Sequence, residues 1–242
     1  MSRNEKIFRI SDLLSSGFDR NRLVADFVRV NEETWPPPIP QEYVWTTEKV
    51  YRQFMNCPHL LYAGIVDGEM ACTLSMAYID EADIYKCSSW HDISGRGTLD
   101  THRENGDSVF GIDLSVSPKY QGRGLADSVM QKAFIISVIL GNKKGAFLGS
   151  RIPGYHRHAG KISVEDYVFG KKRDGKTRDP EIRLYQSTGF RTVKIIPGYM
   201  EDPDSLDYGV LMFWENPFYR YTRHMKIPTR LAQRLTARLL FR

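Results

Sequence analysis

A glycine-rich turn at residues 121–126, Gln-Gly-Arg-Gly-Leu-Ala, has the residue types and spacing of an anion-binding loop. Glycine lets the backbone approach a ligand closely, and the first N–H groups of a following helix have no partner within that helix. These donors and the positive end of the helix dipole together attract a phosphate group. The turn therefore predicts a site for a phosphate-bearing cofactor.

Two regular elements must position this turn. Residues 108–116 alternate apolar and polar side chains, as a strand does, and Pro118 interrupts the alternation. An apolar helix follows the turn as far as Val138. The turn is not a Walker loop, which needs Gly-Lys-[Ser/Thr]. It is not a dinucleotide fingerprint either, because no third glycine opens the helix.

The pattern Leu114-x-Val116-x-Pro118-x-Tyr120-Gln121-x-x-Gly124-x-Ala126 resembles the acyl-CoA signature of the GCN5-related N-acetyltransferase (GNAT) superfamily. In that superfamily, [Gln/Arg]-x-x-Gly-x-[Gly/Ala] begins the helix after the fourth strand. The resemblance implies that acetyl-CoA lays its pyrophosphate on the turn and its pantetheine along the strand. The cofactor-binding residues that it implies are Leu114, Ser115, Val116, Gln121, Gly122, Arg123, Gly124, Leu125, Ala126 and Ser128.

A narrower similarity involves residues 151–156, Asp179-Pro180, Gly189-Phe190 and residues 214–217. These look like the acetyltransferase domains that are fused ahead of carbon–nitrogen hydrolases. The 242 residues contain no such hydrolase segment.

Two residues are candidates for the chemistry. The superfamily usually transfers the acetyl group by direct attack of the amine, and a tyrosine four residues before Gly-Phe faces the thioester sulfur. Tyr185 matches that position and is the candidate general acid, since a phenol can protonate a thiolate. The alternative is a tyrosine packed in the core.

Asp113 lies on the polar side of the predicted strand and is the candidate general base. A structural aspartate is the alternative interpretation. His102, Glu81 and Asp83, or a chain of water molecules, are weaker candidates for the same role.

The segment from Arg151 to His158 follows the fifth strand, where the cleft opens in this fold. Arg151 is a candidate clamp for a carboxylate or phosphate, and Tyr155 and His156 are candidate wall residues of an acceptor pocket. The alternative for Arg151 is a salt bridge that locks the splayed strands. His156-x-His158 lacks a neighbouring Cys, His or acidic cluster, so we predict no metal.

The formal net charge of +5 is concentrated in the C-terminal tail. Seven Lys and Arg residues and no acidic residue lie beyond Asn216, which leaves 27 basic and 29 acidic residues elsewhere. The distribution does not favour a nucleic-acid partner. Residues 229–242 repeat arginine every fourth residue beside a leucine stripe, as in a basic amphipathic helix. The surfaces that this helix could contact are an anionic membrane, an acidic partner, its own domain or a homodimer mate.

The three cysteines form no Cys-x-x-Cys pair, and no apolar run is long enough to cross a bilayer. The N-terminus also lacks a signal-peptide core, so we expect a cytoplasmic protein in a reducing compartment.

The predicted element order is a first strand at residues 7–10, helices at 19–33 and 47–56, a hairpin at 60–79, the strand and helix around the turn, a strand at 146–150, helices at 163–169 and 180–188, and closing strands at 190–196 and 208–214. This order agrees with an α/β GNAT fold. Its mixed, mostly antiparallel sheet would have splayed fourth and fifth strands and flanking helices. We expect an acyltransferase domain at residues 1–217 and a tail at 218–242.

The function that these features predict is transfer of an acetyl group from acetyl-CoA to the amine of a small molecule in a ternary complex. Two alternatives stay open. One is a non-catalytic acyl-CoA-binding sensor, and the other is a transferase for a longer acyl-CoA.

Overall fold

The computed structural model describes residues 5–35, 39–172 and 175–219. Within them a single sheet has the strand order β1-β2-β3-β4-β5-β7-β6. Neighbouring strands are antiparallel except for the parallel pair β4 and β5. The strands are β1 (Glu5–Arg9), β2 (Leu61–Val66), β3 (Glu69–Ile79), β4 (Ser108–Val116), β5 (Gly145–Arg151), β6 (Arg191–Ile196) and β7 (Gly209–Glu215).

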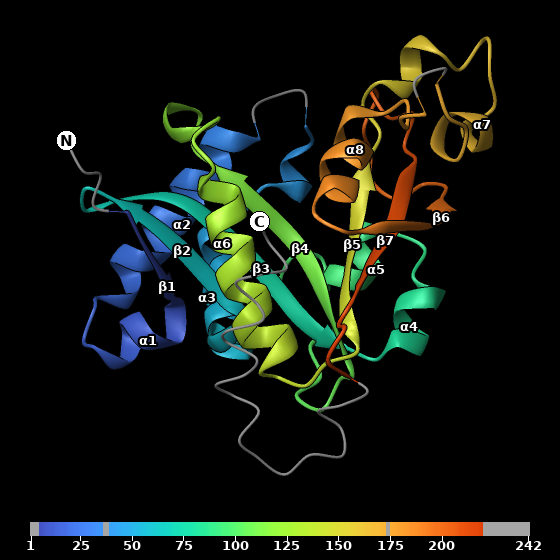
Figure 1. Cartoon of the computed structure of the whole chain (residues 1–242). Helices are drawn as coiled ribbons and strands as arrows, with labels where there is room; N and C mark the ends of the chain where they lie inside the picture. The colour runs from blue at the N-terminus through green and yellow to red at the C-terminus, as the bar shows by residue number, and fades with distance from the viewer. Residues whose placement is uncertain (1–4, 36–38, 173–174, 220–242) are drawn as a thin grey trace.

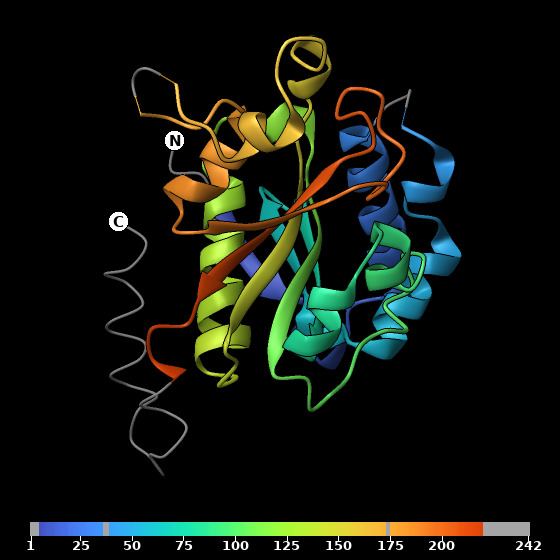
Figure 2. The same cartoon turned by 90° about the vertical axis from the view of Figure 1, so that its right-hand side faces the viewer.

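Helices cover both faces of this sheet. Figure 2 shows α6 and α8 on one side and α2, α3 and α5 on the other. The helices are α1 (Ile10–Ser15), α2 (Arg20–Thr34), α3 (Thr47–Asn56), α4 (Glu81–Lys86), α5 (Trp90–Ser94), α6 (Leu125–Ala133), α7 (Val164–Val168) and α8 (Pro180–Ser187). The predicted α/β fold class and the order of its main elements are thus confirmed.

Polar caps explain where several helices begin. Asp19 accepts from the Arg22 amide at the start of α2, and Ser163 accepts from the Asp166 amide at the start of α7. The sequence offers two adjacent threonines as the cap of α3, and we expected Thr47 to fill that position. Thr46, not Thr47, accepts the hydrogen bond from the Lys49 amide, because Thr46 keeps an extended backbone while Thr47 is already helical.

The parallel strands β4 and β5 diverge after a short pairing. Only Val109, Phe110 and Gly111 of β4 have partners on β5. Both strands continue beyond that point, and Figure 1 shows them separating in the same direction. The sheet therefore opens in its middle, immediately before the glycine-rich turn that follows β4.

The apolar helix predicted as far as Val138 changes its winding. Regular α6 ends at Ala133, and a π-helical turn covers Phe134–Ile139. Ile10, predicted at the end of the first strand, instead begins α1. Its side chain is fully buried in the core, which explains why its apolar character alone did not reveal the helix.

No helix among the described residues has the length and apolar character needed to cross a membrane. Residues 220–242 lie outside the described residues. The amphipathic tail helix and the division of the chain at residue 217 therefore stay predictions.

Candidate active site

A cavity of about 680 Å³ occupies the opening between β4 and β5. Its lining includes the turn that precedes α6 and side chains from β5, α8 and the segment between β6 and β7. Asp113, Arg151, Glu181 and Tyr185 all line this one cavity. The sheet opening thus joins the predicted anion-binding turn to the predicted chemical groups.

The turn itself has the open backbone that a phosphate site requires. Gly122 and Gly124 have φ angles of 70° and 77°, in the left-handed region that favours glycine. An added Cβ at either position would meet no atom within 4 Å, so the turn faces open space. Gly124 is also the residue from which α6 begins.

The structure brings most of the predicted cofactor residues to the cavity. The lining includes Leu114, Val116, Gln121, Gly122, Gly124, Leu125 and Ala126. It does not include Ser115, Arg123 or Ser128. Ser115 is fully buried beneath Asp113, and the Arg123 guanidinium lies 5.3 Å from the centre of the Tyr120 ring.

Asp113 is held by two hydrogen bonds at the cavity wall. Trp35 Nε1 donates to Asp113 Oδ1 at 2.9 Å, and Ser115 Oγ donates to Oδ2 at 2.8 Å. Burial raises the pKa of Asp113 to about 6, although both donors favour its charged form. The carboxyl is thus fixed in place and changes charge close to neutral pH.

Helix α8 directs Tyr185 and Glu181 into the cavity from successive turns of one face. Burial raises the pKa of Tyr185, and the negative charges of Glu181 and Asp113 raise it further. The phenol therefore remains protonated over the physiological range and can act as a proton donor. Burial also raises the pKa of Glu181, to about 7, against the opposing effect of Arg151.

A buried aspartate fixes the beginning of α8. Asp179 Oδ1 accepts hydrogen bonds from the amides of Glu181 and Ile182. Its other oxygen accepts from Tyr167 Oη at 3.1 Å and from the Gly154 amide at 3.4 Å. Asp179 thereby ties the segment between β5 and α8 to the first turn of α8.

Arg151 lines the cavity, but its guanidinium is already engaged. Its Nε and Nη2 donate to Asp202 Oδ2 and Oδ1 at 2.7 and 2.9 Å, and its Cζ lies 5.5 Å from the Trp35 ring centre. Asp202 is almost fully buried, with 2% of its side chain exposed. This geometry matches the salt-bridge alternative for Arg151 and leaves little of the guanidinium for an anionic substrate.

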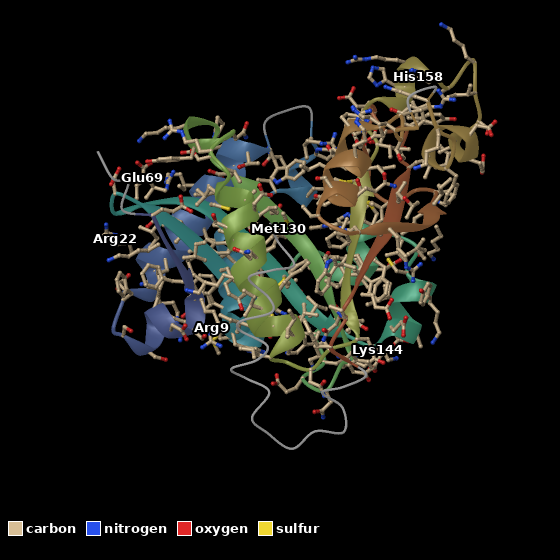
Figure 3. All side chains as sticks on the ribbon, viewed as in Figure 1. Arg9, Arg22, Glu69, Met130, Lys144 and His158 are labelled. Carbon is tan, nitrogen blue, oxygen red and sulfur yellow. The ribbon has the colours of Figure 1, made fainter. Side chains whose placement is uncertain are left out.

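Tyr155 and His156 are not brought to the cavity lining. Tyr155 is buried against Tyr167, and His156 Nδ1 lies at hydrogen-bonding distance from the carbonyls of Pro153 and Asp204. Figure 3 shows His158 at the outer end of this lobe, far from Met130 of α6. The predicted wall residues Tyr155 and His156 are therefore not part of this cavity, because their side chains pack within the segment between β5 and α8 and against Asp204.

The chain matches no known family profile. It is 27% identical over 199 residues to "Uncharacterized N-acetyltransferase YkwB" of Bacillus subtilis (strain 168), covering 81% of this chain and 86% of that protein. "Probable hydrolase YhcX" of the same organism is 28% identical, and the match covers 72% of this chain but 34% of the hydrolase. The solved structure "GphF GNAT-like decarboxylase in complex with isobutyryl-CoA" has a TM-score of 0.68 and 20% identity, with coverage of 81% and 96%.

This chain has the fold of the GCN5-related N-acetyltransferases. The turn before α6 carries the motif on which the resemblance was based, and the splayed fourth and fifth strands that it implied lie beside it. The short match to the hydrolase is consistent with the narrower similarity to domains that are fused to such enzymes.

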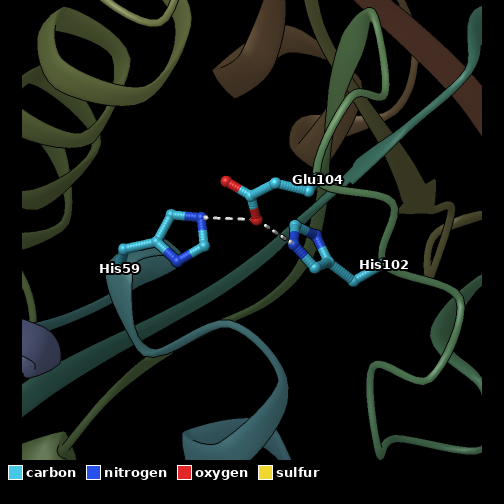
Figure 4. A group of neighbouring side chains, drawn as sticks. All are labelled: His59, His102 and Glu104. Carbon is cyan, nitrogen blue, oxygen red and sulfur yellow. Dashed lines mark hydrogen bonds and ion pairs between the residues drawn. The ribbon is translucent and has the colours of Figure 1, made fainter.

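Outside this cavity, the described residues contain one group with the spacing of a metal site, His59, His102 and Glu104 (Figure 4). The Tyr78 amide donates to His102 Nδ1 at 3.1 Å, so neutral His102 carries its proton on Nε2. That nitrogen lies 3.2 Å from Glu104 Oε2, and a metal would have to displace the proton. Burial lowers the pKa of both histidines, which favours their neutral forms, while the hydrogen bond from His102 lowers the pKa of Glu104 and keeps it charged. We therefore interpret the group as a hydrogen-bonded pair of His102 and Glu104 beside His59.

Sequence reasoning missed several residues of the cavity. Glu181 was overlooked because its position looked like an ordinary acidic first turn of a helix, although its spacing of four from Tyr185 was visible. Trp35 precedes a run of prolines and carries no motif of its own. Tyr199 has no motif, and its place depends on two distant glycines. A Cβ added at Gly149 would lie 2.0 Å from the Tyr199 hydroxyl, and a Cβ added at Gly209 would lie 2.4 Å from the Tyr199 ring.

Proposed function

We propose that this protein transfers an acetyl group from acetyl-CoA to an amine of a small molecule by direct attack in a ternary complex. One observation carries the proposal. A single cavity connects the open glycine turn at residues 121–126 with Asp113 and Tyr185 through the gap in the sheet. A long cofactor can therefore bind at one end and present its thioester at the other.

The residues of the turn fit the cofactor. The backbone around Gly122 and Gly124 faces open space, and the first residues of α6, Leu125 and Ala126, line the same cavity. At Leu114 and Val116 the edge of β4 that faces β5 is unpaired, because β5 has separated from it, and both residues line the cavity. These would hold the pyrophosphate and the pantetheine amides respectively.

The chemistry requires two proton transfers. The amine nitrogen attacks the thioester carbon, the carbon–sulfur bond breaks, and its electron pair moves to sulfur. The raised pKa of Tyr185 keeps its phenol protonated, so Tyr185 can deliver a proton to the departing thiolate. A carboxyl group of the cavity takes the proton from the amine, and Asp113 is the group that the sequence suggested for this role.

Calorimetry with acetyl-CoA and a thiol-release assay with a panel of amines test the proposal. Gly124→Glu should abolish acetyl-CoA binding, because the new carboxylate would occupy the anion site. Gly17→Glu is the matched control, since Gly17 also has a positive φ angle and open space around it.

Unchanged acetyl-CoA affinity in Gly124→Glu would contradict the proposed cofactor site. Binding without amine-dependent thiol release would support the sensor alternative instead. A preference for isobutyryl-CoA over acetyl-CoA in the same assay would support the longer acyl donor.

A further inference from the structure

Glu181 is a carboxyl of the cavity to which the sequence assigned no role. It stands one helical turn before Tyr185, and both side chains line the same cavity. Asp179 caps the helix through the Glu181 amide at 2.8 Å, which fixes the backbone from which the side chain projects. The position of Glu181 relative to the candidate proton donor is thus set by the helix itself.

Glu181 and Asp113 differ in how their oxygens are used. Both oxygens of Asp113 already accept hydrogen bonds, from Trp35 and Ser115. Ser115 Oγ is in turn contacted by Asn31 Nδ2 at 3.2 Å, so this carboxyl belongs to a wider fixed network. Among the described residues, no hydrogen bond or ion pair is formed by the Glu181 carboxyl. Its oxygens are therefore free to meet a substrate.

The charged groups around Glu181 leave it without a counter-ion of its own. Arg151 on β5 faces it but is paired with Asp202 from the segment before β7. Asp179 at the cap adds a second negative charge, and Asp113 on β4 acts with Glu181 on Tyr185. The helix N-terminus is the remaining favourable influence on the carboxylate. A cation would complete this end of the cavity.

We propose that Glu181 binds the ammonium form of the acceptor and accepts its proton before the attack. This inference rests on the proposed acetyl transfer and revises the assignment of the base. The substrate class that follows is a primary amine that is protonated at neutral pH. Asp113 then acts as a fixed negative charge at the wall, and aromatic rings of Trp35, Tyr43 and Trp90 provide surfaces that favour a cation.

The proton balance is complete with these residues. One ammonium proton moves to a Glu181 oxygen, and the neutral amine attacks the thioester carbon. The carbon–sulfur bond breaks, Tyr185 protonates the thiolate, and the extra proton on the amide nitrogen returns to Tyr185. Glu181 releases its proton to water before the next turnover.

Two matched sets of amines test this assignment: benzylamine and alkylamines, which are cationic at pH 7, and anilines, which are already neutral. Glu181→Gln should lower kcat/KM for the cationic set by about 100-fold or more, because a positioned base contributes that much. For anilines it should lower kcat/KM by less than about threefold, because they need no deprotonation before attack. Acetyl-CoA affinity, measured by calorimetry, should not change.

Asp113→Asn is the comparison variant, because it tests Asp113 as the base in place of Glu181. An equal loss for both amine sets in Glu181→Gln, or no loss for either, would overturn the inference. A selective loss in Asp113→Asn but not in Glu181→Gln would return the base to Asp113 and leave the proposed function intact. Acetyl-CoA binding without turnover of any amine would overturn both the proposed function and this assignment.

Discussion

The indole of Trp35 donates a hydrogen bond of 2.9 Å to Asp113 across 78 positions of the sequence. Trp35 follows α2 directly, while Asp113 lies in the middle of β4. The bond therefore fastens the end of the longest described helix to the strand at which the sheet opens. It also places an aromatic ring between the Asp113 carboxyl and the Arg151 guanidinium.

Removing this donor should raise the pKa of Asp113 above its value of about 6. In Trp35→Phe the charged carboxylate loses a hydrogen bond while the neutral acid loses less, so deprotonation becomes harder. We expect a rise of about one pH unit, since a hydrogen bond to a charged group contributes roughly 1.5 kcal/mol. Carbon-13 NMR titration of labelled aspartate measures it.

Trp90→Phe is the control for this prediction. Trp90 lines the same cavity, but its indole donates to the Ile112 carbonyl rather than to a carboxyl. The pKa of Asp113 should stay unchanged in that variant. A pKa that moved equally in both variants, or that fell in Trp35→Phe, would contradict the role of the Trp35 donor.

Breaking the ion pair between Arg151 and Asp202 should affect both stability and proton binding. Asp202→Asn leaves a guanidinium with 17% of its side chain exposed and no carboxylate partner, which we expect to cost about 3 kcal/mol of unfolding free energy. The uncompensated positive charge should also lower the pKa of Glu181 from about 7. Urea unfolding and the acidic limb of the pH–rate profile measure the two effects.

The neighbouring Asp204→Asn serves for comparison, because 63% of that side chain is exposed. It should change stability by less than about 0.5 kcal/mol. An acidic limb that moves to higher pH in Asp202→Asn would show that the pair does not screen Glu181 in the way described.

The position of Tyr199 depends on the absence of a side chain at Gly149. Gly149→Ala would place a Cβ 2.0 Å from the Tyr199 hydroxyl, so the ring must move away from β5. We expect a loss of about 2–3 kcal/mol in stability from this overpacking. Chemical denaturation measures it, with Gly160→Ala as the control, since a Cβ there would meet nothing within 4 Å.

A double variant separates the clash from other causes. Adding Tyr199→Ala removes the ring that the new methyl group strikes, so the two losses should not be additive. Simple additivity would mean that Gly149 matters for some reason other than its contact with Tyr199.

Direct transfer predicts that no cysteine carries the acetyl group. Burial raises the pKa of the Cys57 thiol to about 12 and also raises the pKa values of Cys72 and Cys87. Because the thiolate is the nucleophile, all three should be inert at neutral pH. Incubation with acetyl-CoA alone should add no acetyl mass to the protein, and Cys→Ala variants should keep their turnover. Parallel double-reciprocal plots would indicate an acyl-enzyme instead.

The elements with strong local signals were predictable from sequence. The alternation at residues 108–116 defined β4 to the residue, and the hairpin predicted at 60–79 is formed by β2 and β3. The short helices α4 and α5 were not resolved, because their five or six residues carry too little periodicity. The π-helical turn after Ala133 was also invisible, since its apolar residues continue the pattern of the helix.

The parts of the cavity also differed in how far the sequence alone could predict them. The cofactor turn is a contiguous motif, so its residues could be named in advance, and seven of the ten line the cavity. The rest of the cavity lining comes from residues at the end of α2, on β5 and α8 and in the segment before β7, whose meeting depends on tertiary packing. Arg151 was correctly placed beside the opening, but the chain gave no sign that Asp202, 51 residues later, would bind its guanidinium.

Asp179 couples the segment between β5 and α8 to the orientation of α8. That one carboxylate is shared by Gly154, Tyr167 and the first amides of α8, so a shift in this segment would turn the helix that presents Glu181 and Tyr185. Natural variation or engineering could therefore retune the reacting end by altering surface residues that never meet a substrate. The segment between β5 and α8 would then set the orientation of α8. We expect relatives that differ in this segment to differ in the amines they accept, with the turn at residues 121–126 unchanged.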